Sequence, residues 1–402
     1  MFEINAITNT KGVSQVNFQR SFLQTRRDLI KGLVFSALTP YTMAAPISID
    51  INSTQLFSAA TDNQNKHWLL ITSTTGELIN KLPLPSRAHQ IIKHPFLPLL
   101  CVVARRPGRY LLVVHSKTGA LIKNVSPSRG HHFYGHGLFS RDGKYLVTSE
   151  NHMDSGEGRI TVRNTFSDFE IANQFSSQGI GPHELKLLTD GQTLVVANGG
   201  IKTHPAKGRE KLNINSMRPT LTYLNLQTGQ LLEQASLPPD LHQLSIRHID
   251  VNSQDQVIIA MQYQGDKTDQ FALVASHQRG ASIRLMVAPS STLSRMNQYC
   301  GSVCFDSSGK YALVTSPKGD LITLWDMSTH KVLSEARCPD ACGVTAYEKQ
   351  SFLISSGSGK LYHYSIAVVQ KQPVLMKTKQ MQISSPKHTI KMAWDNHLTL
   401  SI

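Results

Sequence analysis

The sequence has no long apolar run, few cysteines and none of the common catalytic signatures. No stretch of eighteen or more apolar residues occurs along its 402 positions, so we predict no membrane-spanning helix in the mature chain. Five cysteines are too few for a disulfide scaffold at this length, and their odd number leaves at least one thiol free or paired between chains. A P-loop, a dinucleotide fingerprint, a Gly-x-Ser-x-Gly elbow and a His-Glu-x-x-His motif are also absent.

Charge is plentiful, but it is not arranged as in nucleic-acid-binding proteins. The chain has 41 Lys and Arg against 27 Asp and Glu, a formal net charge of +14. Such an excess can mark a nucleic-acid binder or a protein with an anionic partner. No run of five basic residues occurs, and no basic stripe is interleaved with aromatic residues. We therefore interpret the charge as a solvated basic surface and predict no nucleic-acid partner.

Residues 1–45 are predicted to be an export signal. Arg26 and Arg27 are followed by two apolar residues and Lys31, which is the twin-arginine pattern, and a weakly apolar stretch comes next. Small residues around Ala44 suit cleavage by a signal peptidase. No cysteine follows the apolar stretch, which gives no support to a lipid anchor. We predict a periplasmic protein that is exported in the folded state. The alternative is a chance Arg-Arg pair in a flexible tail.

The remaining residues, 46–402, repeat one pattern of short alternating strands. Asp-Gly or Ser-Gly turns between two apolar runs recur, with their glycines at positions 143, 191 and 309. Such a turn is a strong hairpin signal, because glycine adopts positive φ without a Cβ clash. Four short strands in each unit of about 45 residues are typical of a propeller blade. We therefore predict an all-β fold, a seven-bladed β-propeller over residues 46–402.

The two ends of this repeat array are predicted to meet. Residues 391–394 and 398–400 have the pattern of strands and should pair with strands near residues 56–58. Such pairing closes the ring and leaves no open edge strand, which would otherwise favour aggregation. Two β-sandwiches are the alternative fold, but they predict an interdomain linker that the sequence does not contain.

Histidines recur at the same place in successive predicted blades. His89, His136 and His183 follow one another at intervals of 47 residues, and His248 lies at the matching place in a weaker copy. Because innermost strands line the central channel of a propeller, these four imidazoles should converge near one mouth of the axis. Imidazole binds zinc, copper and iron, so we predict that the four are metal ligands. The alternative is a structural role, with each ring bonded to nearby backbone.

Other polar residues gather at the same predicted blade entrances or in a long loop. Long ordered loops on a rigid scaffold usually carry recognition. We predict that a ligand contacts the entrance residues His131, His132, Tyr134, Glu184 and Arg247, and the loop residues Asn198, His204 and Arg218. The sequence does not name the cofactor, and iron, copper and haem are the candidates.

Several motifs resemble those of one known family. They include Gly-His-His-Phe-Tyr-Gly-His-Gly at 130–137 and further stretches at 104–108, 181–185, 195–201, 218–219, 244–248 and 262–265. Together they are similar to the bacterial family called domain of unknown function 1513, whose members are exported and propeller-like. Its members are often encoded beside imelysin-type iron-uptake proteins, so the resemblance implies a role in iron or metal acquisition with periplasmic iron-uptake proteins as partners. The motif at 262–265 adds Gln262 to the expected ligand contacts.

Three functions are consistent with these patterns. The first is a periplasmic binding module that holds a metal, or a metal-containing ligand, at the histidine-lined channel mouth. The second is a metal-dependent oxidoreductase with the same histidines as ligands. The third is a docking platform for another protein, in which the histidines are structural.

Overall fold

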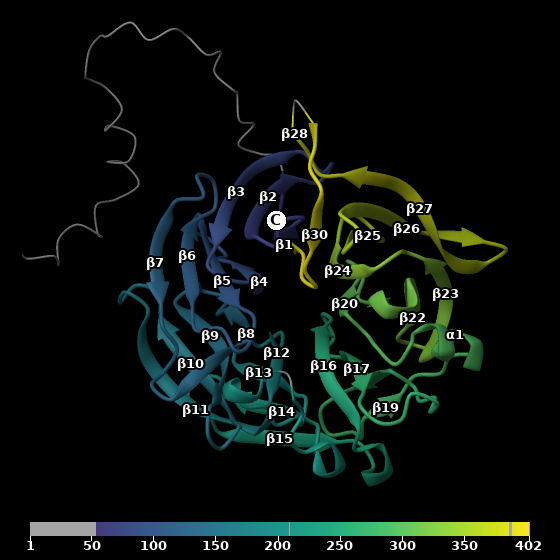
Figure 1. Ribbon diagram of the computed structural model, residues 1–402. Helices are drawn as coiled ribbons and strands as arrows, with labels where there is room; N and C mark the ends of the chain where they lie inside the picture. Colours follow the sequence, from purple (N-terminus) through teal and green to yellow (C-terminus); the bar gives the residue numbers. More distant parts are fainter. Residues whose placement is uncertain (1–53, 209, 386–387, 402) are drawn as a thin grey trace, which may run out of the picture. The chain divides into compact units, whose positions relative to one another are not determined.

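The computed structural model describes residues 54–208, 210–385 and 388–401, which form a ring of seven antiparallel sheets, six of four strands and one of five (Figure 1). This architecture is a seven-bladed β-propeller, as predicted from the repeat. It excludes the alternative of two β-sandwiches, because the sheets follow one another around a single axis. The predicted export signal, residues 1–45, lies outside the described residues.

Six of the seven sheets are each built from four consecutive strands, and the first strand of each lies nearest the axis. The second and third sheets contain β4 (Ala88–Lys93), β5 (Leu99–Ala104), β6 (Leu111–His115), β7 (Leu121–Val125), β8 (His131–Phe139), β9 (Tyr145–His152), β10 (Glu157–Asn164) and β11 (Glu170–Ile180). The fourth and fifth contain β12 (Pro182–Leu187), β13 (Thr193–Asn198), β14 (Thr220–Asn225), β15 (Leu231–Ser236), β16 (Leu244–Val251), β17 (Val257–Tyr263), β18 (Val274–His277) and β19 (Arg284–Leu285). The sixth and seventh contain β20 (Ser302–Phe305), β21 (Tyr311–Ser316), β22 (Leu321–Asp326), β23 (Lys331–Arg337), β24 (Ala341–Ala346), β25 (Ser351–Ser356), β26 (Lys360–Val369) and β27 (Gln372–Gln382).

The first sheet combines the two ends of the described chain. Strands β1 (Gln55–Asp62), β2 (His67–Ser73) and β3 (Leu78–Leu84) come from its beginning, whereas β30 (Met392–Trp394) and β31 (Thr399–Leu400) come from its end. Ala60 pairs with Trp394 and Leu56 pairs with Leu400, so the predicted closure is confirmed. Residues 395–398 join β30 to β31 and therefore take the innermost place in this sheet.

Short elements lie outside the seven sheets. A hairpin of β28 (Ser384–Ser385) and β29 (His388–Thr389) precedes β30. The helical elements among the described residues are one turn or little more, namely α1 (Ser290–Arg295), η2 (Pro205–Lys207), η3 (Ile214–Ser216), η4 (Pro239–Leu241) and η5 (Pro317–Gly319). Over the described ranges, none of these helices has the length and apolar character needed to cross a bilayer.

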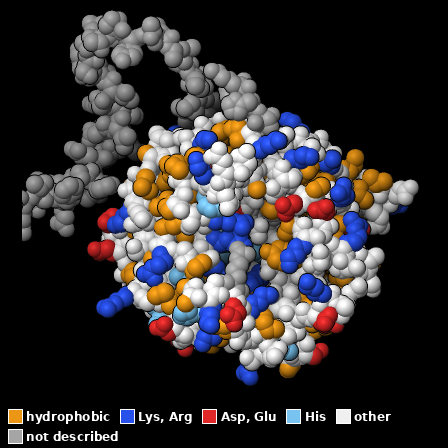
Figure 2. All heavy atoms as spheres, in the orientation of Figure 1, with side chains coloured by type: hydrophobic (Ala, Val, Ile, Leu, Met, Phe, Trp, Pro, Cys, Tyr) orange, Lys and Arg blue, Asp and Glu red, His pale blue; other side chains and the backbone are white. Residues whose placement is uncertain are grey.

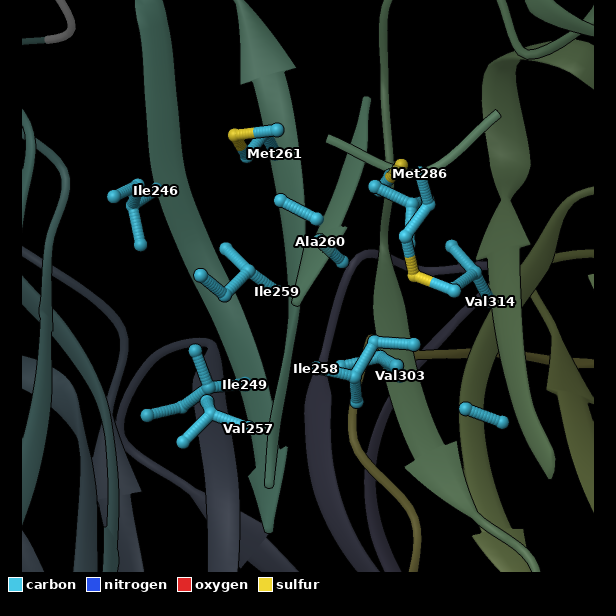
Figure 3. Close-up of a cluster of buried hydrophobic side chains, with 14 of the residues drawn as sticks. Ile246, Ile249, Val257, Ile258, Ile259, Ala260, Met261, Met286, Val303 and Val314 are labelled. Carbon is cyan, nitrogen blue, oxygen red and sulfur yellow. The ribbon is translucent and has the colours of Figure 1, made fainter. Parts of the chain in front are cut away.

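Apolar side chains pack between neighbouring sheets and hold the ring together. Figure 3 shows one such cluster, in which Ile246 and Ile259 of the fifth sheet pack on the same side of the sheet. Val303 and Val314 of the sixth sheet belong to the same cluster. Burying one side chain of this kind stabilises the fold by about 1.5–3 kcal/mol. The inner strands are thereby held at fixed positions around the axis.

The hairpin turns follow the chemistry predicted for them. Gly143 has φ 70° in the turn between β8 and β9, and a Cβ at this position would lie 2.4 Å from the His94 ring. Asp142 accepts a hydrogen bond from the Lys144 backbone N–H at 3.0 Å and so stabilises the same turn. Glycine is needed here both for the positive φ and for the close approach of His94.

Candidate metal centre

Five histidines from five sheets meet at the axis of the ring. His89 lies on β4, His136 on β8, His183 on β12 and His248 on β16. The fifth, His397, lies in the segment that joins β30 to β31. Each therefore takes the innermost place in its own sheet. The structure thus brings together all four histidines that were predicted as ligands and adds one more.

Backbone irregularities in the inner strands turn these histidines toward the axis. The pairing of β4 with β5 shifts between Ala88 and Ile91, on either side of His89. Equivalent shifts occur at His136 in β8, at His183 in β12 and next to His248 in β16. Such bulges bend a strand and redirect a side chain, and they are frequent next to functional sites.

Four of the rings form a closed circuit around the axis. The centroid distances are 5.8 Å from His89 to His183, 4.7 Å from His183 to His248, 5.2 Å from His248 to His397 and 4.6 Å from His397 to His89. The ring of His136 lies between 4.2 and 5.7 Å from each of these four. His136 is therefore the central member of the cluster.

One close contact shows how tightly the inner strands approach at this point. Gly135 has φ 103°, and a Cβ built on it would lie 2.7 Å from Cδ2 of His89. A larger residue at this position would push the His89 ring away from His136. Glycine at position 135 therefore allows the rings of His89 and His136 to lie close together.

The spacing of the imidazole nitrogens suits a metal ion. One nitrogen from each of His89, His136 and His183 forms a group in which all lie within 4.8 Å of one another, and His136, His248 and His397 form a second such group. Metal–imidazole bonds are about 2.1 Å long, so two nitrogens on opposite sides of an ion are at most about 4.2 Å apart. Small inward shifts of the rings are enough to reach that spacing.

Two carboxylates orient two of the rings. Nδ1 of His89 lies 3.2 Å from Oδ1 of Asp395, and Nδ1 of His248 lies 3.0 Å from Oε2 of Glu184. A carboxylate bonded to one ring nitrogen fixes the tautomer and leaves Nε2 free to bind a metal, an arrangement found around many metal-ligating histidines. We therefore expect Asp395 and Glu184 to leave Nε2 of His89 and Nε2 of His248 unprotonated and free to bind a metal.

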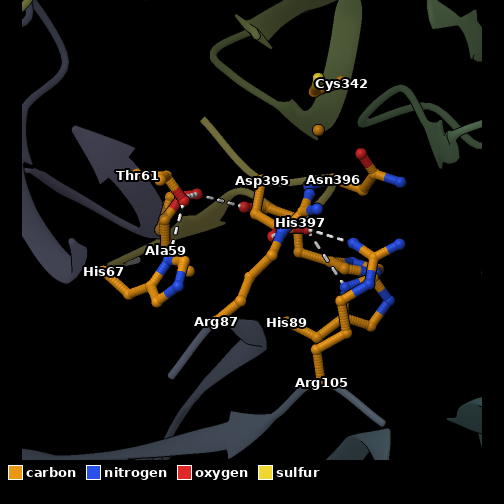
Figure 4. Close-up of polar contacts among 12 residues, drawn as sticks. Ala59, Thr61, His67, Arg87, His89, Arg105, Cys342, Asp395, Asn396 and His397 are labelled. Atoms are coloured by element: carbon orange, nitrogen blue, oxygen red, sulfur yellow. Dashed lines mark hydrogen bonds and ion pairs between the residues drawn. The ribbon is translucent and has the colours of Figure 1, made fainter. Parts of the chain in front are cut away.

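Basic side chains keep these carboxylates ionised. Figure 4 shows Arg87 and Arg105 beside Asp395, with Nη1 of Arg105 3.4 Å from Oδ1. Although burial opposes ionisation, the hydrogen bond from His89 and the two guanidinium groups hold the pKa of Asp395 far below its usual value. Lys186 lies 3.8 Å from Glu184, and the pKa of Glu184 is also lowered despite its burial.

The other three rings have buried nitrogens without hydrogen-bond partners. Both ring nitrogens of His136, Nδ1 of His183 and Nε2 of His397 are in this state. An unmade hydrogen bond at a buried polar group costs about 1–3 kcal/mol. None of the hydrogen bonds found in the described ranges joins any of the five rings to a backbone group. Bonding of each ring to nearby backbone, the alternative considered from the sequence, is therefore not what the structure shows.

Burial favours the neutral form of four of the five rings. It lowers the pKa of His89 to about 4, and it lowers the pKa values of His136, His183 and His397 well below the ordinary value. The positive charge that neighbouring rings would carry lowers these pKa values further. Neutral imidazole has the free lone pair that a metal requires, so the cluster is ready to bind an ion near neutral pH.

A pocket of about 240 Å³ opens directly onto the cluster. His183 is only half-buried because it lines this pocket, as do His89 and His248. Five of the residues predicted as ligand contacts also line it: His132, Tyr134, His204, Arg247 and Gln262. Glu184 is not in the lining and instead bonds to His248.

Three of the predicted contact residues lie elsewhere. His131 is buried with Nδ1 2.9 Å from the Arg129 carbonyl, and Asn198 is buried where its amide donates to the Ser177 carbonyl at 2.9 Å. Arg218 is exposed and is not in the pocket lining. The hydrogen bonds of His131 and Asn198 stabilise local structure, and none of the three residues lines the pocket.

Sequence reasoning missed His397 and Asp395. No Asp-Gly or Ser-Gly hairpin follows them, so the alignment of blades on that turn could not include them. The predicted ring closure could have indicated them, because the segment that closes the ring lies innermost in its sheet, as the strand carrying His89 does in the next sheet. The cysteines are not part of the centre, and all five are free.

The protein is a seven-bladed propeller with a histidine cluster at its axis and a pocket above that cluster. The chain belongs to the family described as protein of unknown function (DUF1513), whose profile matches residues 82–401. The resemblance seen in the motifs is thus confirmed. No curated protein matches the sequence.

Several solved structures have the same fold. A hypothetical selenium-binding protein from Sulfolobus tokodaii is 8% identical with a TM-score of 0.62, covering 87% of this chain and 94% of its own. The periplasmic gluconolactonase PpgL of Pseudomonas aeruginosa is 13% identical with a TM-score of 0.57, covering 85% and 99%. Hydrazine synthase of Kuenenia stuttgartiensis is 15% identical with a TM-score of 0.54, covering 84% and 99%. At these identities the likeness shows the fold alone.

Proposed function

We propose that this protein is a binding module that holds a transition-metal ion at its histidine cluster. The observation that carries the proposal is the convergence of buried imidazole nitrogens that have no other partner. An all-imidazole donor set suits zinc, copper, iron or nickel, whereas magnesium and calcium prefer oxygen ligands. A transition metal would satisfy these nitrogens and so remove the free-energy cost of leaving them unpaired.

The proposal assigns separate tasks to the surrounding residues. Asp395 and Glu184 hold the rings of His89 and His248 in position. The inner strands, fixed by the packed core, keep the five rings close together before an ion arrives. His136 belongs to both groups of nitrogens and would therefore be a ligand in either arrangement.

We further propose that the metal is bound in the periplasm and that the protein serves iron or other metal acquisition. The twin-arginine pattern at Arg26 and Arg27 supports export. Export of a folded protein allows a metal to be bound before or after crossing the membrane. The family resemblance supports the link to iron uptake and suggests periplasmic iron-uptake proteins as partners.

Elemental analysis tests the proposal directly. The full chain, expressed with its own N-terminus, is purified from the periplasm without chelator, and its zinc, copper, iron and nickel contents are measured. We expect at least one of these metals at close to one equivalent or more per chain. A metal-free protein whose melting temperature none of the four ions raises would contradict the proposal and favour a docking platform instead.

The orienting carboxylates give a second prediction. Asp395→Asn and Glu184→Gln remove the negative charge that holds His89 and His248, so each should weaken metal binding by about 10–100-fold. Competition with a chelator of known affinity measures this change. Asp250→Asn is the matched control, because Asp250 pairs with Lys186 but does not contact a histidine ring. Equal affinities in all three variants would show that the carboxylates do not orient the ligands.

A further inference from the structure

The pocket above the cluster has an unbalanced charge. Arg105, Arg106, Lys211, Arg247 and Lys318 all line it, and no Asp or Glu is found among its described lining residues. Figure 2 shows Lys and Arg side chains gathered around the centre of the face in view. Arg105 pairs with Asp395. The other four basic residues form no ion pair with any carboxylate in the described part of the chain.

Arg247 is the most informative of these residues. It precedes His248 on β16, is only 6% exposed, and its Nε has no hydrogen-bond partner. A buried charge is strongly disfavoured unless it is paired. Burial lowers the pKa of Arg247, and the positive charge of Arg106 lowers it further, although the neighbouring Tyr134 phenol acts in the opposite direction. This guanidinium therefore faces a pocket that supplies no counter-charge.

The basic residues also disfavour one another. Partial loss of hydration lowers the pKa of the exposed Lys211, and the charges of Arg247, Lys318 and Arg106 lower it further. Four unpaired cations this close together destabilise the free protein. A bound anion would relieve that repulsion, whereas a neutral ligand would not.

The dimensions of the pocket limit the size of its ligand. Its volume of about 240 Å³ is below the about 300–1,000 Å³ usual for larger ligands, which argues against haem. Planar guanidinium groups match carboxylate and phosphate oxygens in a two-point contact. Tyr299 and Gln264 supply further polar groups to the same lining.

We propose that the pocket binds a small multivalent oxyanion, with carboxylate or phosphate groups, against the Arg247 guanidinium. The anion would lie beside His183 and His248, which line the same pocket. It would then supply oxygen ligands next to the nitrogen ligands of the cluster, and the metal would be held as an anionic complex. The anion site itself stands on the pocket alone, and only the joint complex rests on the proposed metal function.

Calorimetric titration of the metal-free protein tests this inference. Citrate, inorganic phosphate and the neutral sugar glucose are titrated separately at low ionic strength. We expect citrate, phosphate or both to bind, with an affinity that falls as sodium chloride is added, and no heat from glucose. Binding of citrate alone identifies carboxylates, and binding of phosphate alone identifies a phosphate ligand.

Substitutions of the basic pocket residues test whether the anion binds in this pocket. Arg247→Gln should weaken anion binding by about tenfold or more, as expected for a lost charge-assisted hydrogen bond. Because Arg247 is buried, the double variant Lys211→Gln/Lys318→Gln provides a second test at exposed positions. Arg284→Gln, at an exposed position on β19, is the matched control and should bind as the wild type does.

Two results would overturn the inference: no binding of citrate or phosphate, or binding that neither pocket variant weakens. Either result leaves the metal centre untouched, because the titration uses metal-free protein. Conversely, if His136→Ala loses its metal but still binds the anion, the pocket stands and its link to the centre can be tested separately.

Discussion

Replacing His136 by alanine should abolish tight metal binding, with a loss of affinity greater than about a hundredfold. The reason is that His136 belongs to both groups of converging nitrogens. Its removal should therefore exceed the about 10–100-fold loss typical of residues that only orient a ligand. Chelator competition with zinc, copper, iron(II) and nickel measures the affinity, and elemental analysis of the purified variant measures the bound metal.

The structure also predicts that this variant folds. Neither nitrogen of the His136 ring has a partner, so the substitution strands no hydrogen-bonding group, and we expect the metal-free variant to lose no more than about 1–3 kcal/mol of stability. His67→Ala is the matched control, because His67 lies on β2, the third strand outward in its sheet. Unchanged metal content in His136→Ala would refute the assignment of the cluster as a metal centre.

The metal-free protein should lose several kcal/mol of stability between pH 7 and pH 5. His89, His136, His183 and His397 have lowered pKa values in the folded state because they are buried. Below the unfolded-state value of about 6.5 the unfolded chain takes up protons that the folded chain does not, so the free energy of unfolding falls as the pH falls. Over this interval His89 contributes roughly 2 kcal/mol, and the other three rings add to the loss in the same direction.

The limits of this pH window follow from the same pKa values. Above about pH 6.5 both states hold these rings neutral and the stability is fully present. The loss attributable to His89 ends near pH 4, where its ring is also protonated in the folded state. Asp395 and Glu184, whose pKa values are lowered, affect stability only as the pH falls below the usual carboxyl range, so the interval from pH 7 to 5 reports on the histidines.

Urea unfolding followed by circular dichroism at pH 7, 6 and 5 measures the effect. The double variant His136→Phe/His183→Phe removes two of the titrating rings and should show a shallower dependence on pH. A wild-type protein equally stable at pH 7 and pH 5 would mean that the rings are accessible to protons in the folded state. Saturating metal should deepen the dependence, because acid then also competes with the metal for the imidazoles.

The cluster combines a metal site with a pocket on one rigid scaffold. Each inner strand is held by the core between its own sheet and the next, so side chains from five sheets are fixed with little freedom to move apart. The unpaired ring nitrogens of His136 and the guanidinium of Arg247, which has no carboxylate partner within the described segments, lower the stability of the folded protein. Local departures of this kind from good pairing are typical of functional sites, where the missing partner is a ligand.

Much of the candidate centre could be predicted from repeat spacing. His89, His136 and His183 occur at one interval of 47 residues, and a propeller places equivalent positions of successive blades around one axis. This physical regularity is why spacing along the chain translated into proximity in space. The same reasoning identified His248, although its blade is a weaker copy.

Other residues could not be placed in this way. His397 and Asp395 lie in the closing segment, where the turn that fixes the register of the other blades is missing. His131 and His132 are adjacent on β8, and successive side chains of a strand point to opposite faces. His132 therefore lines the pocket, whereas His131 contacts the Arg129 carbonyl. Which of two adjacent polar residues faces the ligand depends on strand register and bulges, and sequence pattern does not fix these.

The amino-acid sequence alone was enough to predict the fold, the number of blades and the closure of the ring, because local turn chemistry repeats at a regular interval. Its motifs, rather than its turns, indicated the family. The folded ring was needed to show that a fifth histidine completes the cluster, that carboxylates orient two of the rings, and that the described lining of the pocket above contains Lys and Arg but no Asp or Glu. These features depend on contacts between residues as far apart as His89 and Asp395, and such contacts exist only once the ring has closed.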